Sequence, residues 1–312
     1  TTPNMFSACK LDKIINTEIN DISQYDKLYN YLVDNPPNIV FHLAAQPLVI
    51  ESYNDPYNTL KTNIEGTYNL LESLRKLDHE VALINITTDK VYENVESNIA
   101  YKENDKLGGH DIYSVSKACS DLITHSYRKS FFDIGVSKIK ISTARSGNVI
   151  GGGDWSDNRL IPDIVRAVSD LTILKIRNPH STRPWQHVLE PLYGYILLAE
   201  KMYNDNSDQF SAAWNFGPSE SQDESVSSIA RKFLKKYKKL SLYTESNSVT
   251  SHKESKLLKL DCNKSYEKLS WKSVLTIDEC LELTYSWYSK YIMSEDMYDT
   301  TCKQIQKYLD SL

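Results

Sequence analysis

The sequence predicts an α/β fold in which helices cover both faces of a doubly wound parallel sheet. Two observations lead to this prediction. Short apolar runs that are typical of buried parallel strands alternate with amphipathic helical stretches through the first two thirds of the chain. Repeated strand–helix–strand units of this kind place their strands in parallel and their helices on the faces of the sheet.

The first of these units occupies the part of the chain before residue 88. Residues 39–45 form an apolar run that ends in the turn chemistry of Pro47, which predicts a buried strand. Residues 56–77 follow, with leucine and isoleucine side chains at the spacing of one helix face. Residues 81–87 then predict the second strand.

The second strand–helix–strand unit is the last part of the chain in which strands and helices alternate regularly. Residues 111–128 predict a helix capped by Asp111, because a side-chain oxygen at that position accepts a hydrogen bond from the first turn. Residues 136–143 predict the third strand. From about Gly217 the helical stretches are short and the connections are rich in Ser, Lys and Asn. We therefore expect a smaller second lobe there, which ends in a helix over residues 277–291.

Composition and charge exclude several classes of protein. The net charge is −5, and the 36 Lys+Arg and 41 Asp+Glu residues are interspersed, so no basic stripe indicates a nucleic acid partner. The five cysteines are scattered without a Cys-x-x-Cys pair, so we expect neither a disulfide framework nor a metal site. No apolar run approaches the ~18 residues of a membrane span, and the first residues lack a signal-peptide pattern. We expect a cytoplasmic protein that has no membrane partner.

The distribution of glycine limits the ligand sites that the first part of the chain can hold. The chain has ten glycines, and none lies before Gly66. The loops that cradle phosphates in dinucleotide sites and P-loops need several glycines at short spacing. Such a loop is therefore excluded from residues 1–65.

Polar side chains follow three of the predicted strands at the point where each strand ends. Residues 44–46 are Ala-Ala-Gln, residues 87–90 are Thr-Thr-Asp-Lys, and residues 146–148 are Ser-Gly-Asn. Ligands of open α/β sheets bind outside the carboxyl ends of the strands. The sequence therefore predicts one ligand site, to which these three segments contribute.

Tyr113 and Lys117 are the strongest candidates for proton transfer. They are four residues apart on a predicted helix and so lie on one face. An ammonium near a phenol favours the phenolate and lowers its pKa from about 10, and Thr88 could share the proton. Tyr57 and Lys61 have the same spacing, but they lack a strand-end hydroxyl upstream, so we interpret them as a solvated helix face.

Residues 88–90 together with Tyr113 and Lys117 resemble the extended short-chain dehydrogenases/reductases that act on nucleotide sugars. Longer stretches narrow the resemblance to the NAD-dependent 4,6-dehydratases, and among these to the branch that acts on CDP-glucose. These stretches are HLAAQPLV at 42–49, LGGHD at 107–111, GNVIGGGDW at 147–155, RNP at 177–179 and RPWQHVLEP at 183–191. The resemblance extends from Thr1 to about Leu309.

The resemblance implies a Rossmann-like doubly wound sheet with a smaller C-terminal substrate-binding lobe. The NAD-binding domain would comprise residues 1–146 and about 185–216, and the nucleotide-sugar lobe residues 147–184 and 217–312. Members of this family open with a strand and a glycine turn that hold the pyrophosphate. We expect that unit to precede Thr1 in a longer chain. The family also implies a homodimer formed through the helices near Pro56 and Asp111.

The implied reaction is the dehydration of CDP-D-glucose to CDP-4-dehydro-6-deoxy-D-glucose. C4 is oxidised by NAD+, water is lost across C5 and C6, and the hydride returns to C6. Tyr113, assisted by Thr88 and Lys117, would deprotonate the 4-hydroxyl, and Asp89 would protonate the leaving 6-hydroxyl. Sister dehydratases carry Glu where this chain has Lys90. Lys90 is thus either the C5 base or a plain ion-pair partner of Asp89.

The resemblance also assigns binding residues. NAD contacts are implied for Asp21, Ile22, Leu43, Ala44, Ala45, Thr62, Thr87, Tyr113 and Lys117. Substrate contacts are implied for Gln46, Thr88, Asn148, Arg159, Leu160 and Arg183. Among these, Asn148 and Arg183 would hold the diphosphate, since a guanidinium donates to it in bidentate geometry. The glycines at 151–153 follow a strand without opening an evident helix, so we interpret them as a flexible substrate loop.

Two alternatives to the dehydratase remain at this point. The first is a nucleotide-sugar epimerase or reductase of the same fold, against which the Asp89-Lys90 pair argues because an epimerase catalyses no elimination. The second is a non-catalytic nucleotide-sugar-binding protein. The early absence of glycine motivates it, and the presence of Thr88, Tyr113 and Lys117 argues against it.

Overall fold

A four-stranded parallel sheet organises the larger part of the molecule. The computed structural model describes residues 2–96, 99–133, 137–176, 178–205, 208–218, 223–245 and 258–312. Within them the strands have the order β1-β2-β3-β8, with β1 at one edge. They span Ile39–His42 (β1), Val81–Ile86 (β2), Ile139–Ser146 (β3) and Ala213–Phe216 (β8). All three pairings are parallel, as the sequence predicts.

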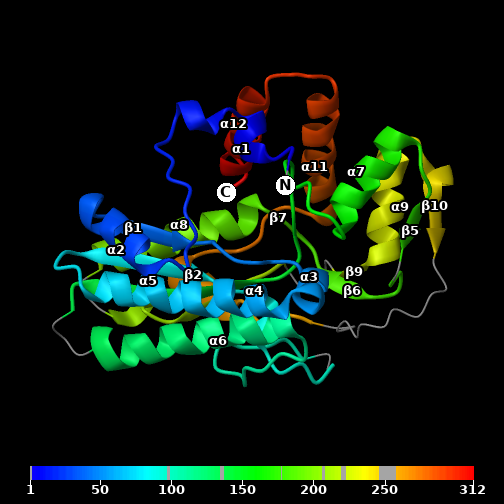
Figure 1. Ribbon diagram of the computed structural model, residues 1–312. Helices are drawn as coiled ribbons and strands as arrows, with labels where there is room; N and C mark the ends of the chain where they lie inside the picture. Colours follow the sequence, from blue (N-terminus) through cyan, green and yellow to red (C-terminus); the bar gives the residue numbers. More distant parts are fainter. Residues whose placement is uncertain are drawn as a thin grey trace.

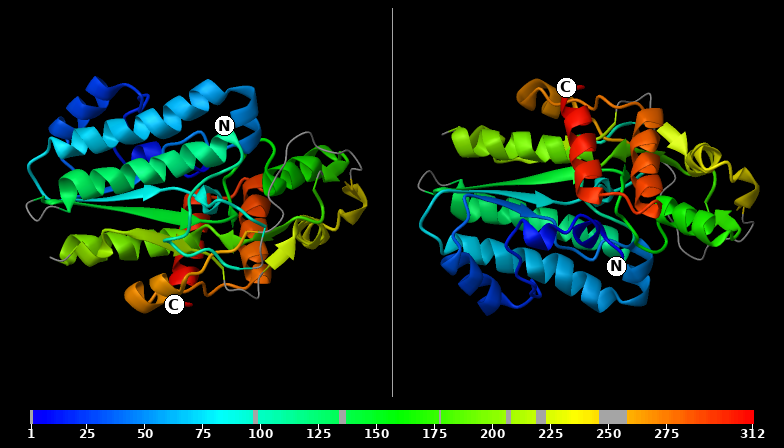
Figure 2. Two further views of the ribbon diagram at one scale, coloured as in Figure 1. Left: turned by 90° about the horizontal axis from the view of Figure 1, so that it is seen from below. Right: turned by 90° about the horizontal axis from the view of Figure 1, so that it is seen from above.

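Helices cover both faces of this sheet (Figures 1 and 2). One face carries α2 (Tyr25–Asp34), α5 (Gly66–Arg75) and α6 (Ile112–Tyr127), and the other carries α8 (Leu189–Asn204) and α10 (Asn263–Leu269). Alternate residues of β2 enter the two cores. Val81 and Leu83 pack with the α2 and α5 leucines, whereas Ala82 and Ile84 pack with α8. This arrangement confirms the predicted α/β architecture.

The helix predicted over residues 56–77 contains an irregularity. It consists of α4 (Pro56–Leu60), a π-helical segment η2 (Lys61–Glu65) and α5, and it follows a short helix α3 (Val49–Asn54). Gly66 allows the N-terminal chain to approach, because a Cβ there would lie 2.5 Å from Cγ2 of Ile22. The sequence therefore predicts the extent of this helical stretch, but not the π-helical segment that interrupts it.

The helix and strand that follow β2 differ in how closely the sequence predicted them. Asp111 caps α6 as predicted and accepts from the backbone N–H of Ser114 at 2.9 Å. The third strand was predicted over residues 136–143, but β3 starts and ends three residues later. The strand continues beyond residue 143 because Thr143–Ser146 pair with β8, which lies far away in the sequence. Residue 136 lies outside the described residues.

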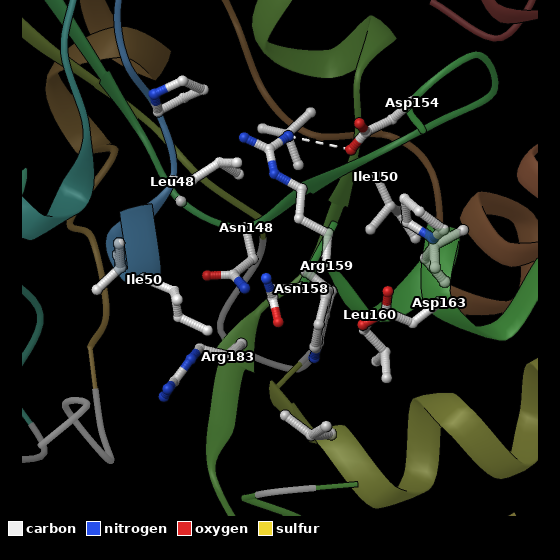
Figure 3. Close-up of a pocket in the computed structure, with 18 of the residues that line it drawn as sticks. Leu48, Ile50, Asn148, Ile150, Asp154, Asn158, Arg159, Leu160, Asp163 and Arg183 are labelled. Carbon is white, nitrogen blue, oxygen red and sulfur yellow. Dashed lines mark hydrogen bonds and ion pairs between the residues drawn. The ribbon is translucent and has the colours of Figure 1, made fainter. Parts of the chain in front are cut away.

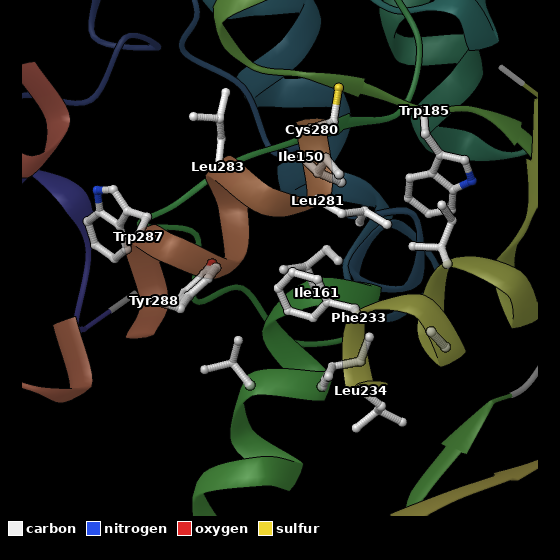
Figure 4. Packing of buried hydrophobic residues seen from close by; sticks show 14 of the residues in the cluster. Ile150, Ile161, Trp185, Phe233, Leu234, Cys280, Leu281, Leu283, Trp287 and Tyr288 are labelled. Carbon is white, nitrogen blue, oxygen red and sulfur yellow. The ribbon is translucent and has the colours of Figure 1, made fainter. Parts of the chain in front are cut away.

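A second lobe has its own core (Figure 4). Its helices are α1 (Met5–Ala8), α7 (Leu160–Asp170), α9 (Val226–Lys236), α11 (Ile277–Ile292) and α12 (Met297–Leu309). Its strands form three pairs: β4 (Val149–Ile150) with β7 (Gln186–His187), β5 (Leu174–Ile176) with β10 (Tyr243–Glu245), and β6 (Thr182–Pro184) with β9 (Asp223–Ser225). Short helical turns span Leu11–Lys13 (η1), Asp89–Val91 (η3), Arg128–Phe132 (η4), Asp208–Phe210 (η5) and Leu240–Leu242 (η7).

The N-terminal helix α1 lies in this second lobe and not against the sheet (Figure 1). Cys9, which follows α1, is buried, and its Sγ donates to the carbonyl oxygen of Met297 on α12 at 3.4 Å. The domain division expected from the sequence placed these residues with the sheet. The structure corrects that point, because the partners of α1 come from the far end of the chain. No helix in the described ranges is both long and apolar enough to cross a membrane.

Candidate active site

A cavity of about 400 Å³ opens where β2 and β3 end, between the sheet and the second lobe (Figure 3). The turn after β2, the loop after β3, the start of α7 and the strands β5 and β6 all line it. Nine of the candidate catalytic and binding residues share this cavity. They are Thr87, Thr88, Asp89, Lys90, Tyr113, Asn148, Arg159, Leu160 and Arg183.

Tyr113 lies in the first turn of α6 and is 8% exposed. Burial raises the pKa of its phenol to about 12, while a hydrogen bond with Thr88 acts in the opposite direction. Thr88 in turn donates to Oδ1 of Asp89 at 3.0 Å. The hydroxyl of Thr88 thus connects the candidate base with the candidate acid.

Lys117 lies one helical turn after Tyr113, but its ammonium is directed to the sheet. Its Nζ donates to the carbonyl oxygen of Ile86, at the end of β2, at 2.8 Å. Burial lowers the pKa of Lys117 to about 8, and the charge of Asp121 partly opposes that shift. The sequence predicted that Lys117 would lower the pKa of Tyr113. The structure corrects this: burial of the phenol prevails, and Tyr113 stays above its ordinary pKa.

Asp89 has the surroundings of a proton donor. Its side chain is 3% exposed, and burial raises its pKa, although the charges of Lys90 and Arg183 act in the opposite direction. Gly147 allows this close packing, because a Cβ there would lie 2.9 Å from Oδ2 of Asp89. A carboxyl group with a raised pKa retains its proton at higher pH and can pass it to a leaving group.

The phosphate-binding candidates line the same cavity as Asp89. Asn148 follows β3, and Arg183 lies on β6 (Figure 3). Arg159 precedes α7 and its Nη1 pairs with Oδ2 of Asp154 at 3.0 Å. Leu160, the first residue of α7, lies beside it. The cavity therefore combines amide and guanidinium donors with an apolar wall.

The glycines at 151–153 are packed and are not the flexible loop that the sequence predicted. A Cβ on Gly151 would lie 2.7 Å from Val188, and one on Gly152 would lie 2.0 Å from the ring of Trp287. Gly153 has φ +80° and lies against Met5, so a side chain there would be both strained and obstructed. Close backbone approach explains these three glycines.

The remaining cofactor candidates lie beyond the cavity lining. Ile22 contacts Gly66, and its carbonyl accepts from Nδ2 of Asn69 at 3.2 Å. Hydrogen bonds from Ser23 hold the pKa of the exposed Asp21 low, and the charge of Lys61, next to Thr62, contributes. The structure thus brings Asp21 and Ile22 to the η2 segment, which contains Thr62.

The carboxyl end of β1 fits the approach of a dinucleotide. Ala44 is exposed and Ala45 half-buried, so small side chains leave the backbone accessible there, and Leu43 is 56% exposed. The β1–β2 register pairs His42 with Asn85, which sets residue 43 beside Ile86 and therefore near Lys117. A role of these residues in binding NAD remains a prediction.

Gln46 lies outside the cavity lining, and its amide is hydrogen-bonded to its own loop and to helix α4. Its Nε2 donates to Oγ1 of Thr59 at 2.7 Å, and its Oε1 accepts from the N–H of Leu48 at 2.6 Å. The side chain of Asn63 forms hydrogen bonds with the backbone of Gln46. It also donates to the hydroxyl of Ser116 on α6 at 2.8 Å. A sugar-facing role for Gln46 remains a prediction.

Two buried residues near the site were not singled out in the sequence. Asp121 and Arg145 form an ion pair at 2.8 Å, with both side chains 3% exposed. The sequence signal for Asp121 is its position four residues after Lys117, which continues the spacing of Tyr113 and Lys117 along one helix face. Arg145 gave no such signal, because its partners come from other elements. Across the described ranges, no group of three or more His, Cys, Asp or Glu side chains is placed to hold a metal ion.

Comparisons with known proteins show the family to which the chain belongs. The family model described as GDP-mannose 4,6 dehydratase matches residues 6–284. A CDP-glucose 4,6-dehydratase of Salmonella typhimurium is 39% identical over 314 residues, which cover 100% of this chain and 87% of the relative. A dTDP-glucose 4,6-dehydratase of Haemophilus influenzae is 24% identical and covers 86% of this chain and 81% of its own.

The fold also matches a solved structure. The dTDP-glucose 4,6-dehydratase of Bacillus anthracis, crystallised with NAD, superposes with a TM-score of 0.75. It is 19% identical and covers 93% of this chain and 85% of its own, so it shows the fold. Since the family model covers most of the chain and the Salmonella relative matches all of it, the chain belongs to the GDP-mannose 4,6 dehydratase family.

Proposed function

We propose that this chain is an NAD-dependent lyase that converts CDP-D-glucose to CDP-4-dehydro-6-deoxy-D-glucose. The observation that carries the proposal is that Thr88, Asp89, Lys90 and Tyr113 line one cavity together with cationic and amide donors. The reaction needs a proton removed from the 4-hydroxyl, a proton removed from C5 and a proton delivered to the leaving 6-hydroxyl. The cavity offers the phenol of Tyr113, the amine of Lys90 and the buried carboxyl group of Asp89 for these steps.

The first proton transfer is assigned to Tyr113, Thr88 and Lys117. When bound, NAD would supply an acceptor that takes a hydride from C4 and later returns it to C6. Tyr113 accepts the proton of the 4-hydroxyl, and Thr88 orients that hydroxyl through the hydrogen bond it shares with Tyr113. Lys117, one helical turn after Tyr113 on α6, is assigned as the residue that assists this transfer.

The elimination is assigned to the turn after β2. A ketone at C4 acidifies the C5 proton, and Asp89 donates its proton to the departing 6-hydroxyl. Burial, which raises the pKa of Asp89, supports this role. Lys90 adjoins Asp89 in the same cavity and is the candidate that removes the C5 proton.

The two lobes divide the ligands between them. We assign NAD to the sheet domain, at Asp21, Ile22, Leu43, Ala44, Ala45, Thr62, Thr87, Tyr113 and Lys117. The nucleotide sugar is assigned chiefly to the second lobe: Asn148 and Arg183 hold the diphosphate, and Arg159 and Leu160 cover the nucleotide. The resemblance between this chain and the CDP-glucose dehydratase of Salmonella supports cytosine as the base of the substrate nucleotide.

Product formation from CDP-glucose tests the proposal. The purified protein with NAD+ is expected to convert CDP-glucose to a product lighter by one water, as detected by mass spectrometry. UDP-, dTDP- and GDP-linked sugars serve as matched substrates and are expected to react at least tenfold more slowly. Turnover of one of these without turnover of CDP-glucose would overturn the CDP assignment, and binding without any turnover would favour a non-catalytic nucleotide-sugar-binding protein.

We also propose that the protein is a cytoplasmic homodimer. The exposed side of α6 carries Val115 and Leu122, seven residues apart, at 37% and 51% exposure. Exposed apolar side chains on one helix face are typical of a helix–helix interface. All five cysteines are free, which supports a reducing compartment.

Replacing Leu122 by glutamate tests the dimer. Charges on the paired helices would repel across the two-fold axis, so Leu122→Glu is expected to give a monomer in analytical ultracentrifugation. Ile196→Glu on α8, at a similarly exposed position (58%), is the matched control and should leave the oligomeric state unchanged. A wild-type protein that sediments as a monomer would refute the interface.

A further inference from the structure

One buried guanidinium contacts two of the segments that carry the catalytic candidates. Arg145 lies near the end of β3 and is 2% exposed. Its Nε and Nη2 donate to the two carboxylate oxygens of Asp121 on α6, both at 2.8 Å. This bidentate geometry fixes α6 at a position one helical turn after Lys117.

The third nitrogen of the same guanidinium is directed to the turn after β2. Nη1 of Arg145 donates to the hydroxyl of Tyr92 at 2.8 Å and to the carbonyl of Glu103 at 2.9 Å. Cζ of Arg145 also lies 5.0 Å from the centre of the Tyr92 ring. Tyr92 follows Lys90 by two residues, so Arg145 connects the helix of Tyr113 and Lys117 with the segment of Asp89 and Lys90.

Asp121 is fully occupied by hydrogen bonds. Besides Arg145, its oxygens accept from the hydroxyl of Thr87 at 3.0 Å and from that of Thr143 at 3.2 Å. Thr87 precedes Thr88, the residue that shares a hydrogen bond with Tyr113. The carboxylate therefore also anchors the start of the catalytic turn.

The charges around Lys117 come from three elements. On α6, Asp121 is the carboxylate that acts on it, and Tyr113 precedes it by one turn. From β2 the carbonyl of Ile86 accepts its hydrogen bond. From β1, His42 faces it, but burial lowers the pKa of His42 to about 3, so that ring is neutral near pH 7. The balance at Lys117 thus depends on how strongly Asp121 is neutralised.

We propose that Arg145 is a positioning residue: it locks α6 to the turn after β2 and neutralises Asp121, so that Lys117 faces no uncompensated carboxylate. Its role as a determinant of rate rests on the function proposed above, whereas its effect on Lys117 does not. Without Arg145 the charge of Asp121 would stabilise the ammonium of Lys117. Without Asp121 the remaining cation would destabilise it.

The consequence appears in the pH dependence of catalysis. In the proposed reaction, Tyr113 can accept the proton of the 4-hydroxyl only after it and Lys117, one helical turn later, have together lost one proton. The lower of the two pKa values is that of Lys117, about 8, so kcat/KM should rise with pH up to about 8 and then level off. The midpoint of that rise reports the electrostatic state of Lys117.

Variants of Arg145 and Asp121 should move this midpoint in opposite directions. Arg145→Met is expected to shift it upward by about one pH unit, which corresponds to a tenfold loss of kcat/KM at a fixed lower pH. Asp121→Asn is expected to shift it downward, because the uncompensated cation opposes the ammonium. Arg145→Lys keeps the charge and is expected to lower kcat without moving the midpoint, because it loses the fork that reaches Tyr92. A residue with a merely structural role would leave the midpoint unchanged in all three variants, and that result would overturn the proposal.

A second measurement needs no turnover. An unfolded lysine has a pKa of about 10.4, and folded Lys117 has a pKa of about 8. Between these values the unfolded chain binds more protons, so the free energy of unfolding should rise with pH relative to Lys117→Met. Arg145→Met should shrink that rise, and Asp121→Asn should enlarge it.

These outcomes separate the inference from the proposed function. If the wild type fails to dehydrate CDP-glucose, the proposed function fails, and urea unfolding at pH 7.5 and 9.5 still tests Arg145. If one of the two single variants fails to fold, the other is compared with the double variant Asp121→Asn/Arg145→Met, which removes both charges. It should keep the wild-type pH response of unfolding. A double variant that behaves like Arg145→Met would overturn the role of charge.

Discussion

Tyr113→Phe is expected to lower kcat by roughly 10²–10⁴-fold, the usual contribution of a positioned acid or base. The ring stays in place at a buried position, so only the hydroxyl that shares a hydrogen bond with Thr88 is lost. Substrate binding depends chiefly on other groups, among them Arg183 and Asn148 in the cavity. The Kd for CDP-glucose should therefore remain within about twofold, in line with the small effect of a change that leaves binding contacts intact.

Steady-state kinetics and isothermal titration calorimetry measure the two quantities separately. The chain supplies a matched control in Tyr57, which has a lysine four residues later but is 75% exposed. Tyr57→Phe should retain the wild-type kcat. If Tyr113→Phe kept more than a tenth of the wild-type kcat, its assignment as the base would be wrong.

Glu190→Ala is expected to lower the free energy of unfolding by about 3–5 kcal/mol, since it leaves several buried donors unpaired. Oε1 of Glu190 accepts from the backbone N–H groups of Val274 and Leu275 at 2.9 and 2.7 Å. Oε2 accepts from the hydroxyl of Tyr308 at 2.9 Å. This fully buried carboxylate therefore joins α8 of the sheet domain to α12 and to the segment before α11.

Urea denaturation measures this loss as a lower midpoint with an unchanged slope. Glu190→Gln keeps an acceptor for the two N–H groups and should cost less, about 1–2 kcal/mol. Glu200→Ala on the exposed side of the same helix should stay within about 0.5 kcal/mol of the wild type. Equal losses for the two alanine variants would contradict a bridging role of Glu190.

Local chemistry made several features predictable from the sequence. The cap of α6 depends on Asp111 and Ser114, which are three residues apart. The placement of Tyr113 and Lys117 on one helix face depends on a spacing of four residues. The carboxyl ends of parallel strands meet at one edge of the sheet, so the sequence alone predicts that Asp89 and Asn148 share one cavity.

Features that depend on distant partners could not be predicted in this way. Gly152 is required by the ring of Trp287, a contact between residues 135 positions apart in the chain, and so it resembled an ordinary flexible glycine. The raised pKa of Tyr113 arises from burial, which no motif encodes. The β3 boundary depended on pairing with β8, and the role of Arg145 depended on α6 and the turn after β2.

The position of α1 has a consequence for the order in which the chain folds. Cys9 contacts Met297, 288 residues later, so α1 cannot complete its packing before α12 has been synthesised. At about 5–20 residues per second, that wait lasts about 15–60 s on the ribosome. The sheet domain, whose strands and helices lie between these two ends, can assemble meanwhile. The second lobe therefore closes only after α12 has been synthesised, and no single cut of the chain would release it as an independent folding unit.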